Sequence, residues 1–367
     1  MDDVRWMQRA LLLAAQGMFT TRPNPRVGCV LVRDGVVVGE GWHERAGAPH
    51  AEVHALRAAG DRARAATAYV TLEPCAHFGR TPPCADALIA AGVARVAVAT
   101  GDPFAHVAGR GLAKLQLAGI AVESGICGAE ARELNLGFFS RIERGRPWVR
   151  AKLAQSLDGR SALSDGRSQW ITGPEARADG HRWRARACAV LTGSGTLLAD
   201  DPRLDTRLDP PEPLASQWRV LVDSRLRAPS NARLWQSAGP VLWVHADPDQ
   251  GAALAVDART RLLALPAACG RVDLDALLRW LGSELSINEL HVEAGPVLTG
   301  ALLAADLVDE LLVYQAPMLL GGQAQPAVQL SEPATLEAAA RWSLREATPI
   351  GRDVRLRYRR RKEVDPR

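Results

Sequence analysis

The segment "PHAEVHAL", residues 49–56, places two histidines and a glutamate directly after a proline. Proline is favoured in the first turn of a helix, so the segment predicts a helix that begins close to His50. Residues two apart on a helix point to different sides, and His50 and Glu52 can therefore face one centre only at the helix start. Taken alone, the segment is compatible with metal binding and with ordinary amphipathic packing.

Two cysteines downstream favour metal binding. The segment "TLEPCAHFGRTPPC", residues 71–84, puts Cys75 just after an apolar strand and Cys84 at the start of the next predicted helix. One imidazole and two thiolates form a three-ligand zinc set that leaves the fourth tetrahedral position for water, which then ionises near pH ~7. We therefore predict one Zn²⁺ per chain on His50, Cys75 and Cys84. Glu52 is predicted to be the general acid and base that carries the proton to a leaving amine.

The remaining histidines and cysteines have less specific interpretations. His54 lies four residues after His50 on the same helix face, where it is either a second ligand or, as we favour, a packing or supporting residue. His77 lies between the two cysteines and is either a rival ligand or, as we favour, a loop or substrate contact. Four cysteines in apolar segments are expected in the core: Cys29, Cys127, Cys188 and Cys269.

Length and composition limit the class of protein. A chain of 367 residues with 47% hydrophobic residues is long enough for two domains, each with its own core. The net charge is +4, but acidic residues are interspersed with the arginines except in the tail "RLRYRRRK", which favours a solvated surface over a nucleic-acid site. Scattered cysteines indicate reduced thiols rather than a disulfide framework.

Hydropathy indicates a cytoplasmic protein without membrane contact. No run approaches the ~18 apolar residues of a membrane span. The early apolar run "LLLAA" is shorter than the apolar region of a signal peptide.

The first part of the chain predicts an α/β domain. Two apolar runs around Asp34-Gly35 predict a β-hairpin. The strands "AYVTL", "RVAVAT" and "IAVES" then alternate with helical patterns, which indicates helices that cover a largely parallel sheet. The segment "ERGRPW", residues 143–148, is a plausible boundary, so we expect one domain at 1–145 and a second at 146–367.

The second part also predicts an α/β domain. Strand candidates recur at "WVRAKLAQS", "ACAVLTG", "WRVLVDS", "GPVLWVHA", "NELHVEAG" and "DELLVYQAP". Connections at 200–217 and 319–336 are long and rich in proline or glycine, as binding loops often are. In "EAGPVLTGALL" the chain leaves a strand at Glu293, turns at Gly295 and Pro296 and enters a helix. The free backbone N–H groups of that helix start suit a phosphate.

The motif "HAE", followed by "PC" and a further cysteine, resembles the zinc-dependent cytidine and nucleotide deaminase superfamily. The usual C-x-x-C spacing is stretched here across residues 76–83. That spacing closely resembles the bifunctional riboflavin-biosynthesis deaminase-reductases. The resemblance covers nearly the entire chain and includes "TTRPNPRVGCVLVRDG", "KLAQSLDGRSALSDGRSQWITG", "VLTGSGTLLADDPRL" and "HVEAGPVLTGALLAADLVDEL".

The resemblance implies a fold and two reactions. The fold would be an N-terminal cytidine-deaminase-like three-layer α/β/α domain followed by a C-terminal dihydrofolate-reductase-like α/β domain. The first would deaminate 2,5-diamino-6-(5-phosphoribosylamino)pyrimidin-4(3H)-one with Zn²⁺. The second would reduce the ribosyl group with NADPH, giving 5-amino-6-(5-phosphoribitylamino)uracil. Asn24 and His43 would be further pocket residues, and a homo-oligomer would form through the reductase half.

The resemblance also implies the residues of the reductase pocket. The cofactor positions would be Ala154, Trp170, Thr196, Asp200, Ser224, Gly295, Pro296, Val297, Leu298, Thr299, Gly300 and Ala301. The substrate positions would be Ser168, Arg184, Leu204, Arg207 and Glu293. The forked guanidinium groups of Arg184 and Arg207 would bind the substrate phosphate.

Several points stay open at this level. Trp170 could instead pack in the core, and Lys152 and Asp158 could be structural or could polarise the substrate. No residue is assigned as the proton donor of the reduction. The sequence places no acidic residue as in the dinucleotide fingerprint that holds a ribose 2′-hydroxyl, which is compatible with NADPH.

Two other functions compete with this one. A nucleic-acid or nucleoside deaminase with a C-terminal binding module would need a basic groove lined with aromatic residues. A non-catalytic scaffold stabilised by zinc would unfold on zinc removal without losing an activity.

Overall fold

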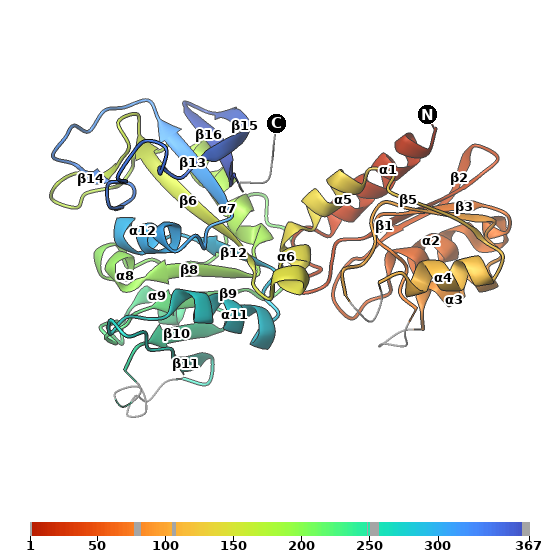
Figure 1. Ribbon diagram of the computed structural model, residues 1–367, viewed down its shortest axis with the longest axis horizontal. Coiled ribbons are helices and arrows are strands. Elements are labelled where there is room, and N and C mark those ends of the chain that lie inside the picture. The colour runs from red at the N-terminus through yellow and green to blue at the C-terminus, as the bar shows by residue number, and fades with distance from the viewer. Residues whose placement is uncertain (1, 77–81, 105–107, 248, 250–256, 362–367) are drawn as a thin grey trace. The chain divides into compact units, whose positions relative to one another are not determined.

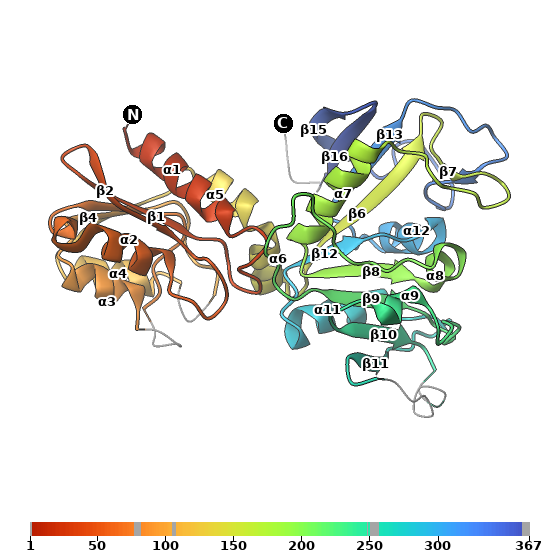
Figure 2. The ribbon, with the colours of Figure 1, turned by 180° about the vertical axis from the view of Figure 1, so that it is seen from behind.

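The computed structural model describes residues 2–76, 82–104, 108–247, 249 and 257–361 (Figures 1 and 2). The chain divides into two compact units. Unit 1 comprises Met1–Gly145 with Pro213–Ala215, and unit 2 comprises Arg146–Glu212 with Ser216–Arg367. Three residues of the long connection at 200–217 thus group with unit 1. None of the helices in the described part of the chain is long and apolar enough to span a bilayer.

Unit 1 has one five-stranded sheet in the order β2-β1-β3-β4-β5. Strands β3, β4 and β5 run parallel, whereas β1 is antiparallel to both β2 and β3, so the sheet is mixed rather than largely parallel. The strands are β1 (Gly28–Arg33), β2 (Val36–Trp42), β3 (Thr67–Val70), β4 (Arg95–Val98) and β5 (Ala121–Ser124). The helices are α1 (Asp2–Gln16), α2 (Ala51–Ala59), η1 (Gly60–Ala63), α3 (Cys84–Ala90), α4 (Arg110–Leu117), α5 (Gly128–Leu134) and α6 (Leu136–Arg144).

Alternation along β1 produces three layers. Cys29 and Leu31 pack on one side of the sheet with apolar residues of α2, α3 and α4. Val30 and Val32 pack on the other side with apolar residues of α1 and α5. Strand residues alternate between the two faces, so one short strand supplies both cores. Figure 1 shows α1 and α5 on one side of this sheet and α2, α3 and α4 on the other. The predicted hairpin is present, and its turn has positive φ at Asp34 (52°) and Gly35 (74°), as a tight primed turn requires.

Unit 2 has a nine-stranded sheet in the order β11-β10-β9-β8-β12-β6-β13-β16-β15. The strands from β11 to β13 run parallel, and β16 and β15 are antiparallel additions at the edge. The strands are β6 (Trp148–Ser156), β7 (Arg160–Ala162), β8 (Ala189–Gly193), β9 (Trp218–Val222), β10 (Val241–His245), β11 (Thr260–Ala264), β12 (Glu289–Val292), β13 (Glu310–Ala316), β14 (Gln325–Pro326), β15 (Trp342–Ile350) and β16 (Asp353–Arg360).

Helices cover both faces of this sheet. They are α7 (Pro174–Arg186), α8 (Ser194–Asp200), α9 (Arg233–Gln236), α11 (Leu274–Glu284) and α12 (Pro296–Ala304). α11 and α12 pack on one face through leucines such as Leu277, Leu281 and Leu302. α8 and α9 pack on the other face through Leu197 and Leu234, and α7 lies on that side too (Figure 2). The sheet is therefore buried on both faces, as parallel sheets require.

The basic tail segment is largely a strand. Arg355, Arg357 and Arg359 lie on β16, which the sequence did not predict as a strand. Each arginine is paired with an acidic side chain: Arg355 with Asp179 at 2.8 Å, Arg357 with Glu346 at 3.6 Å and Arg359 with Glu310 at 3.2 Å. The positive charge of this strand is therefore balanced within unit 2.

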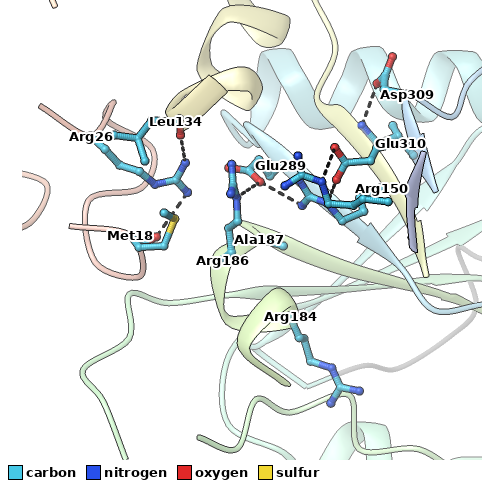
Figure 3. A network of polar contacts seen from close by, with 12 residues as sticks. Met18, Arg26, Leu134, Arg150, Arg184, Arg186, Ala187, Glu289, Asp309 and Glu310 are labelled. Carbon is cyan, nitrogen blue, oxygen red and sulfur yellow. Dashed lines mark hydrogen bonds and ion pairs between the residues drawn. The ribbon is translucent and has the colours of Figure 1, made fainter. Parts of the chain in front are cut away.

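A buried ion network joins the central strands of unit 2 (Figure 3). Arg150 on β6 contacts Glu289 on β12 at 3.1 Å and Glu310 on β13 at 2.5 Å, and these side chains are at most 1% exposed. Arg186 also contacts Glu289, at 2.7 Å. Burying charges is costly unless each is paired. The pairing of Arg150 with Glu289 and Glu310 therefore favours the arrangement in which β6 lies between β12 and β13.

We predict that Arg150→Met lowers the free energy of unfolding by about 3 kcal/mol, because Glu289 and Glu310 would lose the cation between them. Urea denaturation followed by tryptophan fluorescence measures the change. The matched control is Arg279→Met, which breaks an exposed pair with Asp275 on α11 and should cost less than about 0.5 kcal/mol. Equal losses in the two variants would contradict the assigned role of the network.

Candidate functional site

Three predicted ligands meet in unit 1. His50 is the residue before α2, Cys84 is the first residue of α3, and Cys75 follows β3. The Nδ1 atom of His50 lies 3.2 Å from Sγ of Cys84 and 3.8 Å from Sγ of Cys75, and the three ligand atoms lie within 4.8 Å of one another. Tetrahedral zinc with one nitrogen and two sulfur ligands needs N–S separations of about 3.6 Å. The donor set and its spacing therefore fit zinc.

The local backbone explains why Cys75 lies against α3. The N–H of Cys84 donates to Sγ of Cys75 at 3.3 Å, and the N–H of Ala85 donates to the carbonyl of Cys75 at 3.1 Å. The pKa of the Cys75 thiol is lowered, because Cys84 donates to its sulfur and His50 lies beside it. A thiol that favours its thiolate form is prepared for metal binding.

Glu52 lies inside unit 1 and does not belong to the ligand group. Its side chain is 3% exposed, and its Oε2 atom has no hydrogen-bond partner among the described residues. Burial raises the pKa of its carboxyl. A buried carboxyl oxygen without a partner is costly for stability, so its position beside the ligands indicates a chemical use.

Asn24 and His43, expected as pocket residues, are paired next to His50. Nδ1 of His43 donates to the carbonyl of Pro49 at 3.2 Å, which leaves Nε2 to accept from the amide of Asn24 at 3.0 Å. The rings of His43 and His50 meet edge to face at 5.4 Å. Burial lowers the pKa of His43, so this neutral tautomer is maintained.

Of the two other candidate histidine ligands, the structure describes His54 but not His77. His54 is absent from the ligand group found in the described residues, and it lies over β2, where a Cβ on Gly41 would be 2.5 Å from the Cβ of His54. This geometry agrees with a packing residue. His77 lies outside the described residues.

Glu73 is a buried residue that the sequence did not single out. Its carboxylate accepts backbone N–H bonds from Gly109 at 3.0 Å and Gly111 at 2.9 Å. A Cβ at Gly111 would lie 2.0 Å from the carbonyl oxygen of Pro74, so glycine is required at this approach. Glu73 thereby fixes the start of α4 against the turn that carries Cys75.

The expectation of four core cysteines was partly wrong. Cys29 and Cys188 are buried, whereas Cys127 is half-buried before α5 and Cys269 is exposed. Cys269 lies in a turn at 267–271, closed by a hydrogen bond from the N–H of Ala267 to the carbonyl of Arg271. Its apolar neighbours in the sequence are turn residues, so their composition did not indicate burial.

A cavity of about 1220 Å³ in unit 2 follows the carboxyl ends of strands β6, β8, β9 and β12. Such ends are the usual ligand site of open parallel sheets. All five expected substrate residues line it: Ser168, Arg184, Leu204, Arg207 and Glu293. Ten of the expected cofactor residues line it too: Ala154, Trp170, Thr196, Asp200, Ser224, Gly295, Pro296, Val297, Leu298 and Ala301. Both long connections reach it, through residues such as Arg203 and Gln325.

Two expected cofactor residues lie elsewhere. Thr299 is 1% exposed and its hydroxyl donates to the carbonyl of Ala294 at 3.2 Å. Gly300 packs on the far side of α12, where a Cβ would lie 1.8 Å from the carbonyl oxygen of Gln329. Helical periodicity turns positions 299 and 300 away from 297, 298 and 301.

The turn into α12 has the features of a phosphate site. Thr196 accepts a hydrogen bond from the N–H of Gly295 at 2.9 Å, which fixes the turn, and Pro296 begins the helix. The first N–H groups of a helix have no partner within it, and Gly295 keeps the approach open. These residues and the size of the cavity fit a dinucleotide.

Arg184 and Glu293 form a bidentate ion pair, with two N–O distances of 2.7 Å. Burial opposes ionisation of Glu293, but the charge of Arg184 outweighs it and holds the pKa of Glu293 well below its ordinary value. Arg184 also donates to the carbonyl of Asp205. Much of the Arg184 fork is therefore occupied. Arg207 makes longer contacts, 3.7 Å to Asp205 and 3.4 Å to His181, and its side chain is 63% exposed, so it is better placed to meet a phosphate.

Three open residues can now be placed. Trp170 is 63% exposed with its ring 4.4 Å from the guanidinium of Arg177, so it does not pack in the core. Asp158 accepts backbone N–H bonds from Leu320 at 3.1 Å and Gly321 at 2.7 Å, which is a structural role. Lys152 lines the cavity near Glu293, and burial lowers its pKa.

Comparison with known proteins assigns a family to both parts of the chain. The RibD C-terminal domain matches residues 147–356, and the cytidine and deoxycytidylate deaminase zinc-binding region matches residues 1–100. The riboflavin biosynthesis protein RibD of Escherichia coli is 49% identical over 364 residues, which cover 96% of this chain and 98% of that protein. The chain belongs to the RibD family. RibD of Haemophilus influenzae is 46% identical over 373 residues, with 97% of each chain covered.

Solved structures of the RibD family share the fold of the whole chain. Acinetobacter baumannii RibD has a TM-score of 0.90 at 42% identity and covers 98% of this chain and 99% of its own. A diaminohydroxyphosphoribosylaminopyrimidine deaminase/5-amino-6-(5-phosphoribosylamino)uracil reductase from Thermotoga maritima has a TM-score of 0.86 at 29% identity, with 98% of each chain covered. The expected cytidine-deaminase-like and RibD-type reductase folds are confirmed.

We predict that His50→Ala and Cys84→Ser each lose the zinc ion, whereas His54→Ala keeps about one zinc per chain, because only the former remove a ligand. Elemental analysis of the dialysed protein measures the content. Loss of zinc from His54→Ala with unchanged circular dichroism would make His54 a ligand and contradict the assignment.

Proposed function

We propose that this chain performs two consecutive reactions on one phosphorylated aminopyrimidine, with the residue roles given below. It is a bifunctional zinc-dependent deaminase and NADPH-dependent reductase of riboflavin biosynthesis, as membership of the RibD family implies. The observation that carries the proposal is the convergence of His50, Cys75 and Cys84 beside the unpartnered buried carboxyl of Glu52. The substrate is 2,5-diamino-6-(5-phosphoribosylamino)pyrimidin-4(3H)-one, and the final product is 5-amino-6-(5-phosphoribitylamino)uracil.

In the deaminase site the zinc ion, when bound, supplies an acidified water for attack on the ring carbon that carries the 2-amino group. Glu52 accepts the proton of that water at its free Oε2 and passes it to the amine nitrogen. The carbon–nitrogen bond then breaks and ammonia leaves. The raised pKa of Glu52 suits both steps, because a group that alternates between acid and base works best near the operating pH.

In the reductase site bound NADPH would supply a hydride to the ribosyl C1′, whose bond to O4′ would break in the reduction. The released O4′ needs a proton. Lys152 is suited to donate it, because it lines the cavity as a half-buried cation whose pKa is lowered by desolvation. Arg184 and Glu293 hold each other in the wall of the cavity, and the exposed Arg207 is suited to bind the substrate phosphate.

Two competing functions are not favoured. A deaminase with a nucleic-acid-binding module is opposed by the RibD C-terminal domain at residues 147–356 and by the paired arginines of β16. A zinc scaffold without activity gives no reason to bury Glu52 unpaired. We also propose that the enzyme is cytoplasmic, binds no nucleic acid and forms a homo-oligomer through unit 2. The exposed edge strand β15 is compatible with such assembly, which light scattering would test.

We expect Glu52→Gln to reduce ammonia release at least ~10³-fold, because glutamine cannot accept the proton. The same variant should reduce the pre-deaminated uracil substrate at the wild-type rate. Ammonia release and NADPH absorbance are followed in separate assays. Loss of both activities in a folded variant would contradict two independent sites.

Lys152→Met should lower the reductase kcat by about 10²–10⁴-fold and leave ammonia release unchanged, because only the reduction needs its proton. In the wild type, reductase kcat should fall as the pH rises through a pKa below 10.5, since Lys152 donates only while protonated and burial lowers its pKa. A pH profile of single-turnover NADPH oxidation measures this. A rate that stays flat up to pH ~10.5 would exclude Lys152 as the donor.

A further inference from the structure

One end of the reductase cavity carries arginines whose charge is not neutralised. Arg184 is paired with Glu293, and Arg227 contacts Asp223 at 3.9 Å and donates to Ser194. The guanidinium groups of Arg225 and Arg271 also line the cavity, but neither makes an ion pair or hydrogen bond within the described residues. Arg233 at the start of α9 also lines the cavity without a side-chain partner among the described residues, but only Arg225 and Arg271 adjoin the hydrogen-bonded pair Ser224 and Val272. Two adjacent unpaired cations indicate an anionic ligand group.

Both arginines are held on fixed turns that meet at Ser224. The N–H of Val272, next to Arg271, donates to the hydroxyl of Ser224, next to Arg225, at 3.1 Å. The first turn is closed by the N–H of Leu226 on the carbonyl of Asp223, and the second by the N–H of Ala267 on the carbonyl of Arg271. The backbones of the two cations are therefore ordered before any ligand binds.

The acidic groups beside Ser224 do not face the cavity. Asp223 is fully buried, with one oxygen accepting the N–H of Ala228 at 2.9 Å and the other 3.9 Å from Arg227. Asp200 lines the cavity too, but it lies at the end of α8 rather than beside Ser224. Asp273 caps α11 by accepting the N–H of Ala276 at 3.0 Å. A ribose 2′-hydroxyl is usually held by a free carboxylate, whereas a 2′-phosphate is accommodated by arginine. This end of the cavity is thus suited to a phosphate.

The distance across the sheet separates this end from the reacting end. Ser224 follows β9, whereas Lys152 lies on β6, and two strands separate β9 from β6. Three strand spacings correspond to about 14 Å, which matches the length of an extended dinucleotide rather than that of the substrate's ribose phosphate. The turn at Gly295, which follows β12, lies between the two ends and suits the pyrophosphate.

We propose that Arg225 and Arg271 form a clamp for the 2′-phosphate of NADPH and thereby set the preference of this reductase for NADPH over NADH. The inference rests on the proposed reductase function and deepens it. Each guanidinium can donate two parallel hydrogen bonds to the dianionic phosphate. NADH lacks the 2′-phosphate, so its binding would form no ion pair with Arg225 or Arg271.

The test is equilibrium binding to the full-length protein, independent of turnover. Titration calorimetry with 2′,5′-ADP and 5′-ADP, and tryptophan fluorescence quenching with NADPH and NADH, give the dissociation constants. Arg225→Gln and Arg271→Gln should each weaken NADPH and 2′,5′-ADP by about 10–100-fold, because hydrogen bonds to charged groups are lost. The affinities for NADH and 5′-ADP should change less than about threefold, and the double variant should lose the preference.

Two matched variants test whether the loss of any nearby arginine, rather than of Arg225 or Arg271, weakens NADPH binding. Arg233→Gln removes another arginine that lines the cavity, and Arg279→Gln removes one from the outer face of α11. Both should keep the preference for NADPH. A double variant that keeps the wild-type preference, or one that weakens NADPH and NADH equally, would overturn the clamp. A wild-type protein that binds neither dinucleotide would overturn the proposed reductase function as well.

Discussion

The parallel run of strands in unit 2 is the constraint from which its chemistry follows. From β11 to β13 the described strands point the same way, so their carboxyl ends reach one edge of the sheet together. The chain must leave each strand there, and residues distant in sequence, such as Lys152, Ser224 and Glu293, line one cavity. Helices on both faces keep the edge fixed, so the strand residue Lys152 and the residues on the following loops keep their geometry.

The carboxylates inside the two units differ in whether their oxygens have hydrogen-bond or ion-pair partners, and this difference distinguishes structural groups from a reactive one. Glu73 is satisfied by backbone N–H groups and Glu293 by the fork of Arg184, so both act as fixed anchors. Glu289 and Glu310 share Arg150 in the same manner. Glu52 has an oxygen with no such partner among the described residues, and this is the carboxyl on which proton transfer depends. Asp205, Asp223 and Asp353 also have a buried oxygen without a hydrogen-bond partner in the described part of the chain, so it is the position of Glu52 in the same helix start as the ligand His50 that connects it to the chemistry.

The metal ligands could be predicted from the sequence because zinc chemistry admits few donors. His50 and Cys84 each lie at a helix start, and Cys75 follows a strand. Few folds bring three such residues together except around a metal ion. The hairpin at Asp34-Gly35 was equally clear, since its turn needs positive φ. Local signals of this kind survive folding because they depend on a few neighbouring residues.

Other features depended on tertiary contacts and could not be predicted. Arg184 and Glu293 were both expected in the substrate pocket, but the ion pair between them, across more than a hundred residues, gave no signal in the sequence. Cys269 lies in an apolar segment that forms an exposed turn. Strand β16 was missed because its arginines mask a strand pattern until their acidic partners are known. The rotation of Thr299 and Gly300 away from the cavity, by contrast, follows from helical period and could have been found.

The two units have separate hydrophobic cores, one built around β1 and the helices that flank it, the other around the nine-stranded sheet. A mutation that inactivates one domain can therefore leave the folding and activity of the other unchanged. Two mutant alleles, each defective in a different half, could then restore vitamin synthesis when expressed in the same cell, provided that the deaminated intermediate diffuses from one polypeptide to the other.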